Sequence, residues 1–390
     1  MIERTLTAKI IALAQKFQVI TLTGPRQSGK TTLVRAAFPA LPYVSLEEPD
    51  IRQIALADPR GFLSNYPAGV ILDEIQHTPD LFSYIQSIVD GNRQAQFILT
   101  GSSNFLLMEK ISQTLAGRTA VLRLLPFSMA ELQPNVPPFE QYESLIFKGQ
   151  YPRLYDRDIA PTDFYPSYIQ TCVERDVRLV KNIGDVNAFI QFTQLCAGRI
   201  GQLLNYTALA NDAGVSPNTA KAWLSVLESS YILYRLQPFH RNFNKRPVKS
   251  PKLYFYDTGL ACSLLGLREE GQVNLHYMKG ALFEDLVITE FVKRHFHRGE
   301  HHLPYFWQDH HGKEIDCLFV EGETILPIEI KPGKTIANNY FENLGYWRQL
   351  TGRAEKQGYV VYGGDQSMQT SAGAFISWRH LERIEALPSA

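Results

Sequence analysis

The sequence contains few cysteines, no excess charge of either sign and no long apolar run. Its four cysteines are far apart and form no CxxC pair, which argues against a zinc ribbon or a disulfide framework. The 39 basic and 39 acidic residues cancel, so nucleic-acid binding would need a local basic patch. No apolar run approaches the length of about 20 residues that a transmembrane helix needs. The first 17 residues read as an amphipathic helix rather than a signal peptide. We therefore predict a cytoplasmic protein without a membrane segment.

The first 127 residues alternate short β-rich runs with helical patterns. After the N-terminal helix, residues 18–23 form an apolar run that ends at a glycine, and a helix is expected from about Lys30. Further short apolar runs lie at Tyr43–Leu46, Val70–Leu72 and Gln96–Thr100. Strands that alternate with helices are typical of an α/β domain with a mainly parallel sheet. This is the expected fold class for residues 1–127.

A phosphate-binding pattern follows the first predicted strand. The segment matches GxxxxGK[ST] and supplies the expected nucleotide-binding residues Gly24, Pro25, Arg26, Gln27, Ser28, Gly29, Lys30, Thr31 and Thr32. Glycines let the backbone N–H groups face the phosphates, and the following helix offers its positive N-terminal end. Lys30 is expected at the β- and γ-phosphates and Thr31 at Mg²⁺. A strand before the pattern and a helix after it support this interpretation.

Two carboxylates end the predicted strand at Val70–Leu72. Asp73 is expected to hold Mg²⁺ through water, and Glu74 to polarise the water that attacks the γ-phosphate. Beside the phosphate loop, this interpretation is favoured over a solvated acidic turn. The next strand ends in small polar residues, of which Thr100, Ser102 or Asn104 could lie between the γ-phosphate and the water. A hydrogen-bonded strand-to-loop turn is the alternative for these residues.

Arg118 follows in the segment LAGR. It could act as an arginine finger that reaches the γ-phosphate of a neighbouring subunit. A surface arginine in an ion pair is the alternative.

The four segments TGPRQSGKTT, VILDEIQ, ILTGSSN and LAGR together resemble the AAA-type domain of a widespread prokaryotic ATPase family. Members of that family carry this domain ahead of a C-terminal domain long described as of unknown function. The resemblance covers almost the whole chain. It implies an AAA+ fold, ATP and Mg²⁺ as cofactors, ATP hydrolysis, and a homo-oligomer that is expected to be a hexameric ring.

The middle of the chain is expected to contain a helical lid or linker over residues 128–199 and a winged helix-turn-helix over residues 200–257. Gly214 would supply the tight turn, and Ser216 would cap the second helix, with Pro217 at its first position. A hairpin would follow as the wing. The residues Arg241, Lys245, Arg246, Lys249 and Lys252 lie between its strands or at their ends. Such a basic tip beside a recognition helix favours nucleic acid as the partner, although the same fold also binds proteins.

Residues 258–390 contain the pattern D…ExK on two predicted neighbouring strands. Asp316 and Glu329 could bind a divalent metal, with the Ile330 carbonyl beside them. Lys331 could position or activate the attacking water, or stabilise the pentavalent phosphate. Glu284, on a long helix, would complete the acidic cluster. The pattern resembles the restriction-endonuclease-like PD-(D/E)xK fold. An active metal-dependent nuclease and a module that grips DNA without cutting it both remain open.

Two functions follow from these patterns. The first is an AAA+ ATPase that binds and remodels DNA, branched, forked or single-stranded, with nuclease activity as an open addition. The second is a nucleotide-dependent switch or scaffold that acts on protein partners through an inactive nuclease-like module. A metabolite kinase is disfavoured because no substrate lid is evident. The histidines between His295 and His311 read as a polar loop rather than a metal site.

Overall fold

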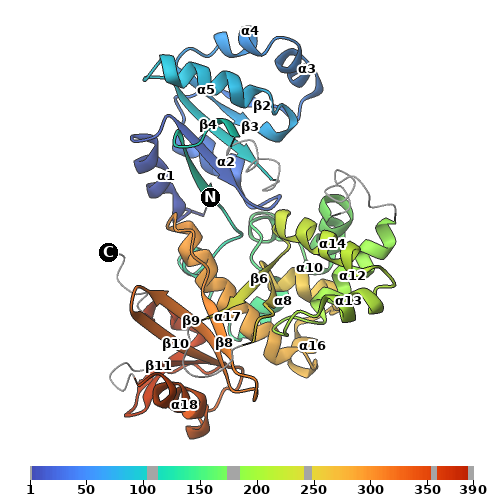
Figure 1. Ribbon diagram of the computed structural model, residues 1–390, viewed down its shortest axis with the longest axis vertical. Coiled ribbons are helices and arrows are strands. Elements are labelled where there is room, and N and C mark those ends of the chain that lie inside the picture. Colours follow the sequence, from blue (N-terminus) through green and yellow to red (C-terminus); the bar gives the residue numbers. More distant parts are fainter. Residues whose placement is uncertain (1, 103–112, 174–184, 241–247, 353–357, 385–390) are drawn as a thin grey trace.

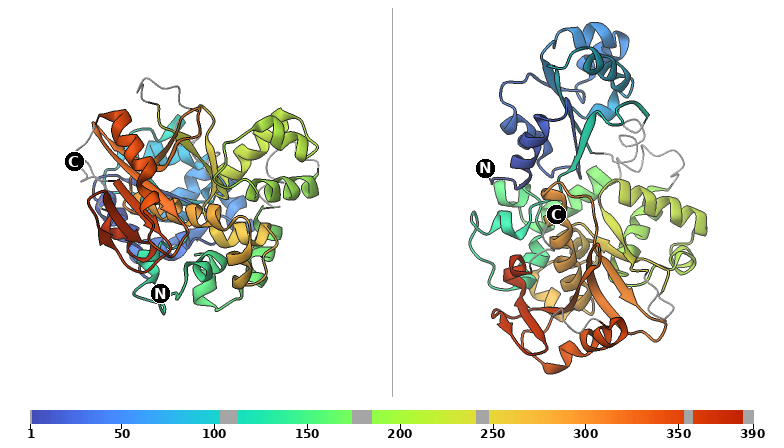
Figure 2. Two further views of the ribbon diagram at one scale, coloured as in Figure 1. Left: turned by 90° about the horizontal axis from the view of Figure 1, so that it is seen from below. Right: turned by 60° about the vertical axis from the view of Figure 1, so that its left-hand side comes forward.

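A computed structural model describes residues 2–102, 113–173, 185–240, 248–352 and 358–384 of the protein. Figure 1 shows an N-terminal α/β unit above a larger unit of helices and a second sheet, and the two further views in Figure 2 show the same division. Within the described residues, no helix is both long enough and apolar enough to cross a membrane.

The N-terminal unit contains a five-stranded parallel sheet with strand order β2-β3-β4-β1-β5. Its strands are β1 (Val19–Thr23), β2 (Tyr43–Ser45), β3 (Gly69–Asp73), β4 (Gln96–Gly101) and β5 (Thr119–Arg123). Its helices are α1 (Leu6–Ala14), α2 (Lys30–Ala37), α3 (Pro49–Ala57), α4 (Pro59–Ser64), η1 (Ile75–His77) and α5 (Leu81–Gly91). The predicted parallel α/β domain is therefore confirmed.

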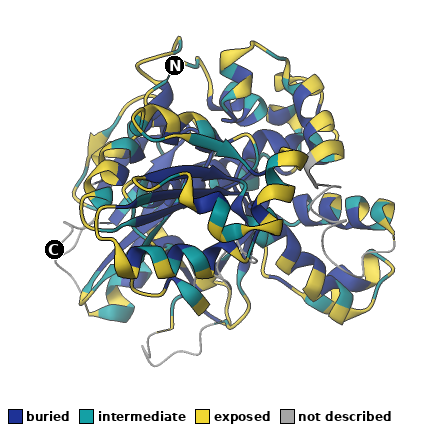
Figure 3. Cartoon of the chain, turned by 90° about the horizontal axis from the view of Figure 1, so that it is seen from above, coloured by how far each residue is buried: buried dark blue, intermediate teal, exposed yellow. Residues whose placement is uncertain are grey.

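Alternate residues of each strand enter opposite hydrophobic cores. Val70 and Leu72 of β3 face the core that also contains residues of α3, α4 and α5, whereas Ile71 faces the core of α1 and α2. A parallel sheet that is covered on both faces needs such nearly continuous apolar strands. In Figure 3 the central strands are dark blue, while many outer helix surfaces are yellow. All carboxyl ends of the strands meet at one edge of the sheet.

Helices dominate the middle of the chain. They are α7 (Met129–Leu132), α8 (Tyr142–Lys148), α9 (Arg153–Asp156), α10 (Pro161–Tyr168), η2 (Ile169–Val173), α12 (Val186–Ala197), α13 (Tyr206–Asp212) and α14 (Pro217–Ser229). Gly214 adopts a φ of +67° between α13 and α14, which favours glycine, and the Ser216 hydroxyl accepts the Thr219 N–H at 3.0 Å as a helix cap. The two predicted short helices thus form where expected.

The second sheet has eight strands in the order β12-β13-β11-β10-β9-β8-β6-β7. Its strands are β6 (Leu233–Pro238), β7 (Lys252–Phe255), β8 (Tyr305–Gln308), β9 (Glu314–Glu321), β10 (Thr324–Lys331), β11 (Gly358–Tyr362), β12 (Met368–Gln369) and β13 (Gly373–Ser377). The remaining helices are α15 (Thr258–Leu264), α16 (Glu270–Leu275), α17 (Lys279–His297), η3 (Asn338–Phe341), α18 (Glu342–Thr351) and η4 (Trp378–Arg383).

The predicted hairpin forms, but it is not a free wing. β6 and β7 pair in antiparallel fashion, and β6 also pairs with β8 through Gln237 and Pro238. The boundary predicted at residue 257 therefore falls within one continuous sheet. Sequence patterns show that strands exist, but they do not show which edge a strand joins. The winged-helix assignment and the four domain limits remain predictions.

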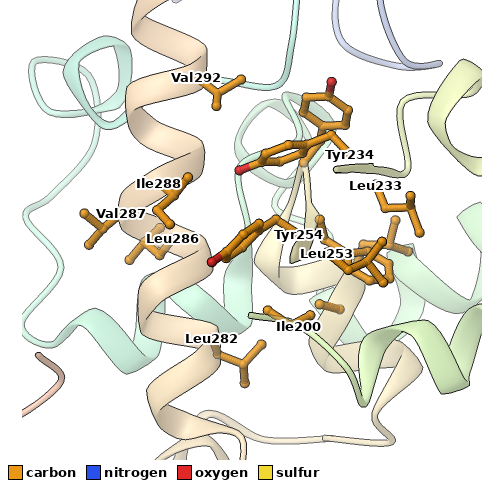
Figure 4. Close-up of a cluster of buried hydrophobic side chains, with 14 of the residues drawn as sticks. Ile200, Leu233, Tyr234, Leu253, Tyr254, Leu282, Leu286, Val287, Ile288 and Val292 are labelled. Carbon is orange, nitrogen blue, oxygen red and sulfur yellow. The ribbon is translucent and has the colours of Figure 1, made fainter. Parts of the chain in front are cut away.

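Helix α17 connects the two units. Its apolar side chains pack against the β6–β7 hairpin, where Tyr234 and Tyr254 lie against Leu286 and Ile288 (Figure 4). Figure 1 shows the helix running from the second sheet up to the base of the N-terminal unit. The chain that follows α17 contacts that unit closely, because a Cβ added at Gly299 would lie 2.8 Å from the Lys9 side chain.

Candidate functional site

The phosphate loop connects the end of β1 to the start of α2. Gly24 has a φ of +152°, and a Cβ added to it would lie 2.1 Å from the carbonyl oxygen of Leu124. Gly29 has a φ of +92° and caps α2, so glycine suits this conformation as well. Both glycines of the pattern are thus required by the loop conformation. The strand–loop–helix context has the predicted form.

Polar groups inside the loop suit an anionic ligand. The Lys30 ammonium donates to the carbonyl oxygens of Gly24 and Pro25 at 2.9 and 2.8 Å, so it lies against the inner side of the loop. The Ser28 hydroxyl oxygen is buried, and no hydrogen-bond partner for it exists within the described residues. A buried polar group normally has such a partner. These features and the N-terminus of α2 fit phosphate groups.

Asp73 lies at the carboxyl end of β3, beside the loop. Three hydroxyls donate to its carboxylate: Thr31 and Tyr43, each at 2.7 Å, and Thr100. Burial, together with the Asp73 carboxylate, raises the pKa of Tyr43, so the phenol keeps its proton. The direct Thr31–Asp73 contact places together the two side chains that the sequence assigned to Mg²⁺. An oxygen-rich set of this kind suits that ion.

Glu74 follows with a φ of +56°, an uncommon conformation for a residue other than glycine. Its carboxylate accepts hydrogen bonds from Gln76 and, at 3.2 Å, from Ser102. Strained backbone of this kind concentrates at functional sites. The structure thus places Ser102 beside Glu74 and Thr100 beside Asp73, whereas Asn104 lies outside the described residues.

Arg118 is remote from the phosphate loop of its own chain. It precedes Thr119, which pairs with Val19 at the start of β1, whereas the loop follows the end of that strand. Its guanidinium binds both carboxylate oxygens of Asp90, at 2.6 and 3.0 Å. Within one chain Arg118 therefore forms the surface ion pair, and a finger role would need a second copy of the protein.

A second polar site lies between α17 and the second sheet. Glu284 of α17 and Glu314 and Asp316 of β9 each offer a carboxylate oxygen, and these oxygens lie within 4.8 Å of one another. We call these three residues the acidic cluster. Glu314 was not predicted as a ligand. It is two residues from Asp316 on the same strand and therefore on the same face.

A lysine occupies the acidic cluster. The ammonium of Lys252, from β7, lies 3.3 Å from the Glu284 carboxylate and also binds Glu314. Burial alone would lower the pKa of Lys252, but the surrounding carboxylates raise it. Burial raises the pKa of Glu314 to about 7. The prediction that Lys252 belongs to an exposed basic hairpin tip is therefore wrong. The Lys252 side chain is buried, and its ammonium contacts the carboxylates of the acidic cluster.

Glu329 and Lys331 lie on β10, next to Asp316. The Lys331 ammonium is 2.5 Å from Glu329 and 3.5 Å from Asp316, whose carboxylate also accepts the Ile330 N–H at 2.7 Å. Burial raises the pKa of Glu329 to about 8, with Asp316 adding to the effect. One Glu329 oxygen is buried without a partner among the described residues. The predicted D…ExK residues are thus together. Glu329 is not one of the three clustered carboxylates, however, and Lys331 bridges it to Asp316.

The candidate DNA surface is only partly described. Residues 241–247, which include Arg241, Lys245 and Arg246, lie outside the described residues. The exposed face of α14 carries Asn218, Lys221 and Ser225, and Lys221 lies over the Tyr206 ring. The prediction of a polar loop for the histidines is wrong for two of them, because His295 and His297 lie in the last turn of α17 and His297 is buried.

Three protein-family models match consecutive segments of the chain. Residues 16–133 match the AAA domain family, and residues 139–271 and 279–381 match two domains of unknown function (DUF8612 and DUF4143). The uncharacterized protein Rv2008c of Mycobacterium tuberculosis is 30% identical over 325 residues, which cover 82% of this chain and 71% of that protein. The chain belongs to the same family as Rv2008c. It is an AAA-type ATPase of that family.

More distant similarities extend to archaea. The uncharacterized protein MJ1637 of Methanocaldococcus jannaschii is 24% identical and matches 70% of the chain and 67% of its own length. A solved structure, the Walker-type ATPase PABY2304 of Pyrococcus abyssi, is 14% identical with a TM-score of 0.45 and matches 68% of this chain and 96% of its own length.

Several contacts in this Rv2008c-family protein were not predicted from its sequence. Tyr43 and Gln76 contact the two carboxylates that follow β3, and Lys252 fills the acidic cluster. Arg4 donates a hydrogen bond to the carbonyl oxygen of Ser28 in the phosphate loop. No short pattern marks these positions, because they lie on elements that only the fold brings together. The alternation of Glu314 with Asp316 on one strand was the available signal for Glu314.

Proposed function

We propose that this ATPase couples ATP hydrolysis to the binding and remodelling of DNA that is branched, forked or single-stranded, with a metal-dependent nuclease centre at the acidic cluster. The observation that carries the proposal is the juxtaposition of the acidic cluster with the Glu329–Lys331 pair. Carboxylates beside a lysine on adjacent strands suit cleavage of a phosphodiester. The predicted cofactors are ATP and Mg²⁺.

At the phosphate loop, Lys30 would contact the β- and γ-phosphates of ATP. Thr31 and Asp73 would hold Mg²⁺, which neutralises charge on the phosphates. Glu74 would accept a proton from the attacking water once Gln76 and Ser102 release its carboxylate.

At the acidic cluster, Glu284, Glu314 and Asp316 would hold a divalent cation, and Glu329 could supply a further oxygen. A divalent cation there would polarise a phosphodiester and lower the pKa of water. Lys331 would stabilise negative charge on the phosphate. The described residues fit a cation only if the Lys252 ammonium moves, because it already lies at the cluster.

DNA would meet the protein at α14 and the segment that links β6 to β7. Lys221 and Lys249 are exposed in this region. A homo-oligomer, proposed to be a hexameric ring, would allow Arg118 to reach the nucleotide of a neighbouring subunit. Both the DNA and the ring are proposals that follow from the sequence patterns.

The alternative function is a nucleotide-dependent switch that acts on protein partners. Lys252 favours this alternative, since a buried ammonium compensates two carboxylates without any metal. In that case the acidic cluster would be a structural ion network and the nuclease-like module would not cut.

The test measures ATP hydrolysis with single-stranded, duplex, forked and four-way DNA, and measures cleavage with added Mn²⁺. The proposal expects DNA of one class to stimulate hydrolysis and the Asp316→Asn and Lys331→Ala variants to lose cleavage. Lys313→Ala, an exposed lysine of the same domain, is the control. The proposal would be overturned if none of these DNA molecules changes the rate of ATP hydrolysis and no DNA complex forms at low salt.

A further inference from the structure

Arg4 is buried behind the phosphate loop. Only 7% of its surface is exposed, and its guanidinium donates to the Ser28 carbonyl at 2.8 Å and to the Leu125 carbonyl at 2.6 Å. The guanidinium also lies 4.7 Å from the centre of the Phe127 ring. Ser28 belongs to the loop and Leu125 follows β5, so one side chain joins the loop to the strand beside β1.

The contact with Ser28 fixes the direction of a peptide group. In a trans peptide the C=O and the following N–H point in opposite directions. Because Arg4 holds the Ser28 carbonyl, the N–H of Gly29 points away from Arg4. That N–H has no acceptor among the described residues, so it is available to a ligand. Gly29 is also the residue at which the peptide could turn most easily, since glycine has the widest conformational freedom.

Two residues that are distant from Arg4 in the sequence, Glu131 and His297, hold its guanidinium. Its Nε donates to Glu131 at 3.1 Å, and its Nη2 lies 3.4 Å from Nε2 of His297, in the last turn of α17. His297 Nδ1 lies 3.4 Å from the other Glu131 oxygen. Burial lowers the pKa of His297 despite the neighbouring carboxylate, so the ring is neutral at pH 7. A neutral ring can accept the Arg4 N–H at Nε2, while Nδ1 is buried near Glu131 without a hydrogen-bond partner among the described residues.

We infer that Arg4 is a positioning residue for nucleotide binding: it orients the Ser28–Gly29 peptide toward the phosphates, and Glu131 and His297 hold it in place. The planar guanidinium is suited to this role because it serves several acceptors at fixed angles, which an ammonium cannot do. The phosphate loop is therefore shaped in part by α17, the helix that also carries Glu284. The inference rests on nucleotide binding at this loop.

The experiment measures binding of a fluorescent ADP analogue and ATPase kinetics with the full chain. The variants are Arg4→Lys, Arg4→Gln and His297→Gln. The control is Arg294→Lys, which alters an arginine on α17 that bonds to Ile384 and not to the loop. Unfolding midpoints of all variants are recorded, so that lost affinity is separated from lost fold.

Arg4→Lys is expected to weaken ADP binding on the order of tenfold, which corresponds to one hydrogen bond with a charged partner. KM for ATP should rise similarly while kcat changes less than about threefold, because the loop contacts phosphates in ground and transition states alike. His297→Gln should give a smaller loss in the same direction, and Arg294→Lys should give none.

ADP affinity within twofold of the wild type in both Arg4 variants would overturn the inference, even if their unfolding midpoints fall. If Arg4→Gln does not fold, Arg4→Lys and His297→Gln decide the question, and unchanged affinity in both overturns it. A wild-type protein that binds no ADP would instead defeat the assignment of the loop itself, so the two failures are distinguishable.

Discussion

The two polar sites hold their carboxylates in different ways. At the phosphate loop, Asp73 is surrounded by neutral hydroxyl donors, which stabilise its negative charge without cancelling it. At the acidic cluster, the Lys252 ammonium contacts Glu284 and Glu314, and the Lys331 ammonium lies 3.5 Å from Asp316. The surroundings of Asp73 thus fit the proposed Mg²⁺ site, whereas the acidic cluster already contains its counter-charges. A cation at the second site would have to replace an ammonium.

Lys30→Ala is expected to produce the largest effect. The variant removes the ammonium that is proposed to contact the β- and γ-phosphates, so kcat/KM for ATP should fall by at least about 100-fold, in the range seen when a preorganised charge-stabilising group is removed. Steady-state ATP hydrolysis measures this loss. Lys16→Ala, an exposed lysine at the end of the first helical segment, is the control. An active Lys30→Ala protein would mean that the loop does not serve the ATPase.

Lys252→Met tests whether the acidic cluster depends on its lysine. Removal of the ammonium leaves the buried carboxylates uncompensated, which should lower the free energy of unfolding by about 3 kcal/mol. Mn²⁺ should stabilise the variant more than the wild type, because the cation can then bind the carboxylates that the Lys252 ammonium contacts in the wild type. Urea unfolding with and without Mn²⁺ checks this. A variant that Mn²⁺ does not stabilise would favour the switch function over the nuclease.

Glu329 makes stability depend on pH. Its pKa of about 8 lies above the ordinary value of 4.5, so the folded protein retains a proton that the unfolded chain releases. Stability is therefore lost as pH rises from about 4.5 to 8, and Glu329→Gln should gain stability over the wild type at pH 8.5 but not at pH 4.5. The gain has an upper limit of about 5 kcal/mol, since one pKa unit corresponds to about 1.4 kcal/mol.

Urea unfolding across this pH range, with a chelator present, measures the effect of Glu329→Gln. Glu321→Gln, at the end of β9, is the control. Parallel pH curves for the wild type and the Glu329 variant would contradict the burial argument.

Arg118→Ala should have the smallest effect on the isolated chain, because its ion pair with Asp90 is exposed. Nucleotide affinity should not change. If Arg118 serves a neighbouring subunit, hydrolysis by the variant should stay low at every protein concentration, whereas the wild-type rate per chain should rise with concentration. Equal behaviour of the two proteins would leave Arg118 as a surface residue.

The fold of the N-terminal half could be predicted from the sequence more fully than the fold of the C-terminal half. In the N-terminal half, β1, β3 and β4 form at the predicted runs, and α2 begins at Lys30 as expected. Local pattern sufficed because a parallel α/β unit alternates its elements in chain order. In the C-terminal half the hairpin, the two strands that carry Asp316 and Glu329, and the long helix that carries Glu284 also form as predicted. The joining of β6 to β8 was not predicted, since pairing between distant segments leaves no periodic signal.

The sequence alone determined the phosphate loop, because its glycines, Lys30 and Thr31 lie within one continuous turn whose chemistry depends on local spacing. It also determined that Asp316, Glu329 and Lys331 lie on two strands. Only the tertiary structure decided that Lys252 enters the acidic cluster and that Arg4 and His297 meet behind Ser28. These contacts join residues far apart in the chain. A buried charged group needs a partner, and which residues become its partners depends on how the folded core brings the segments together.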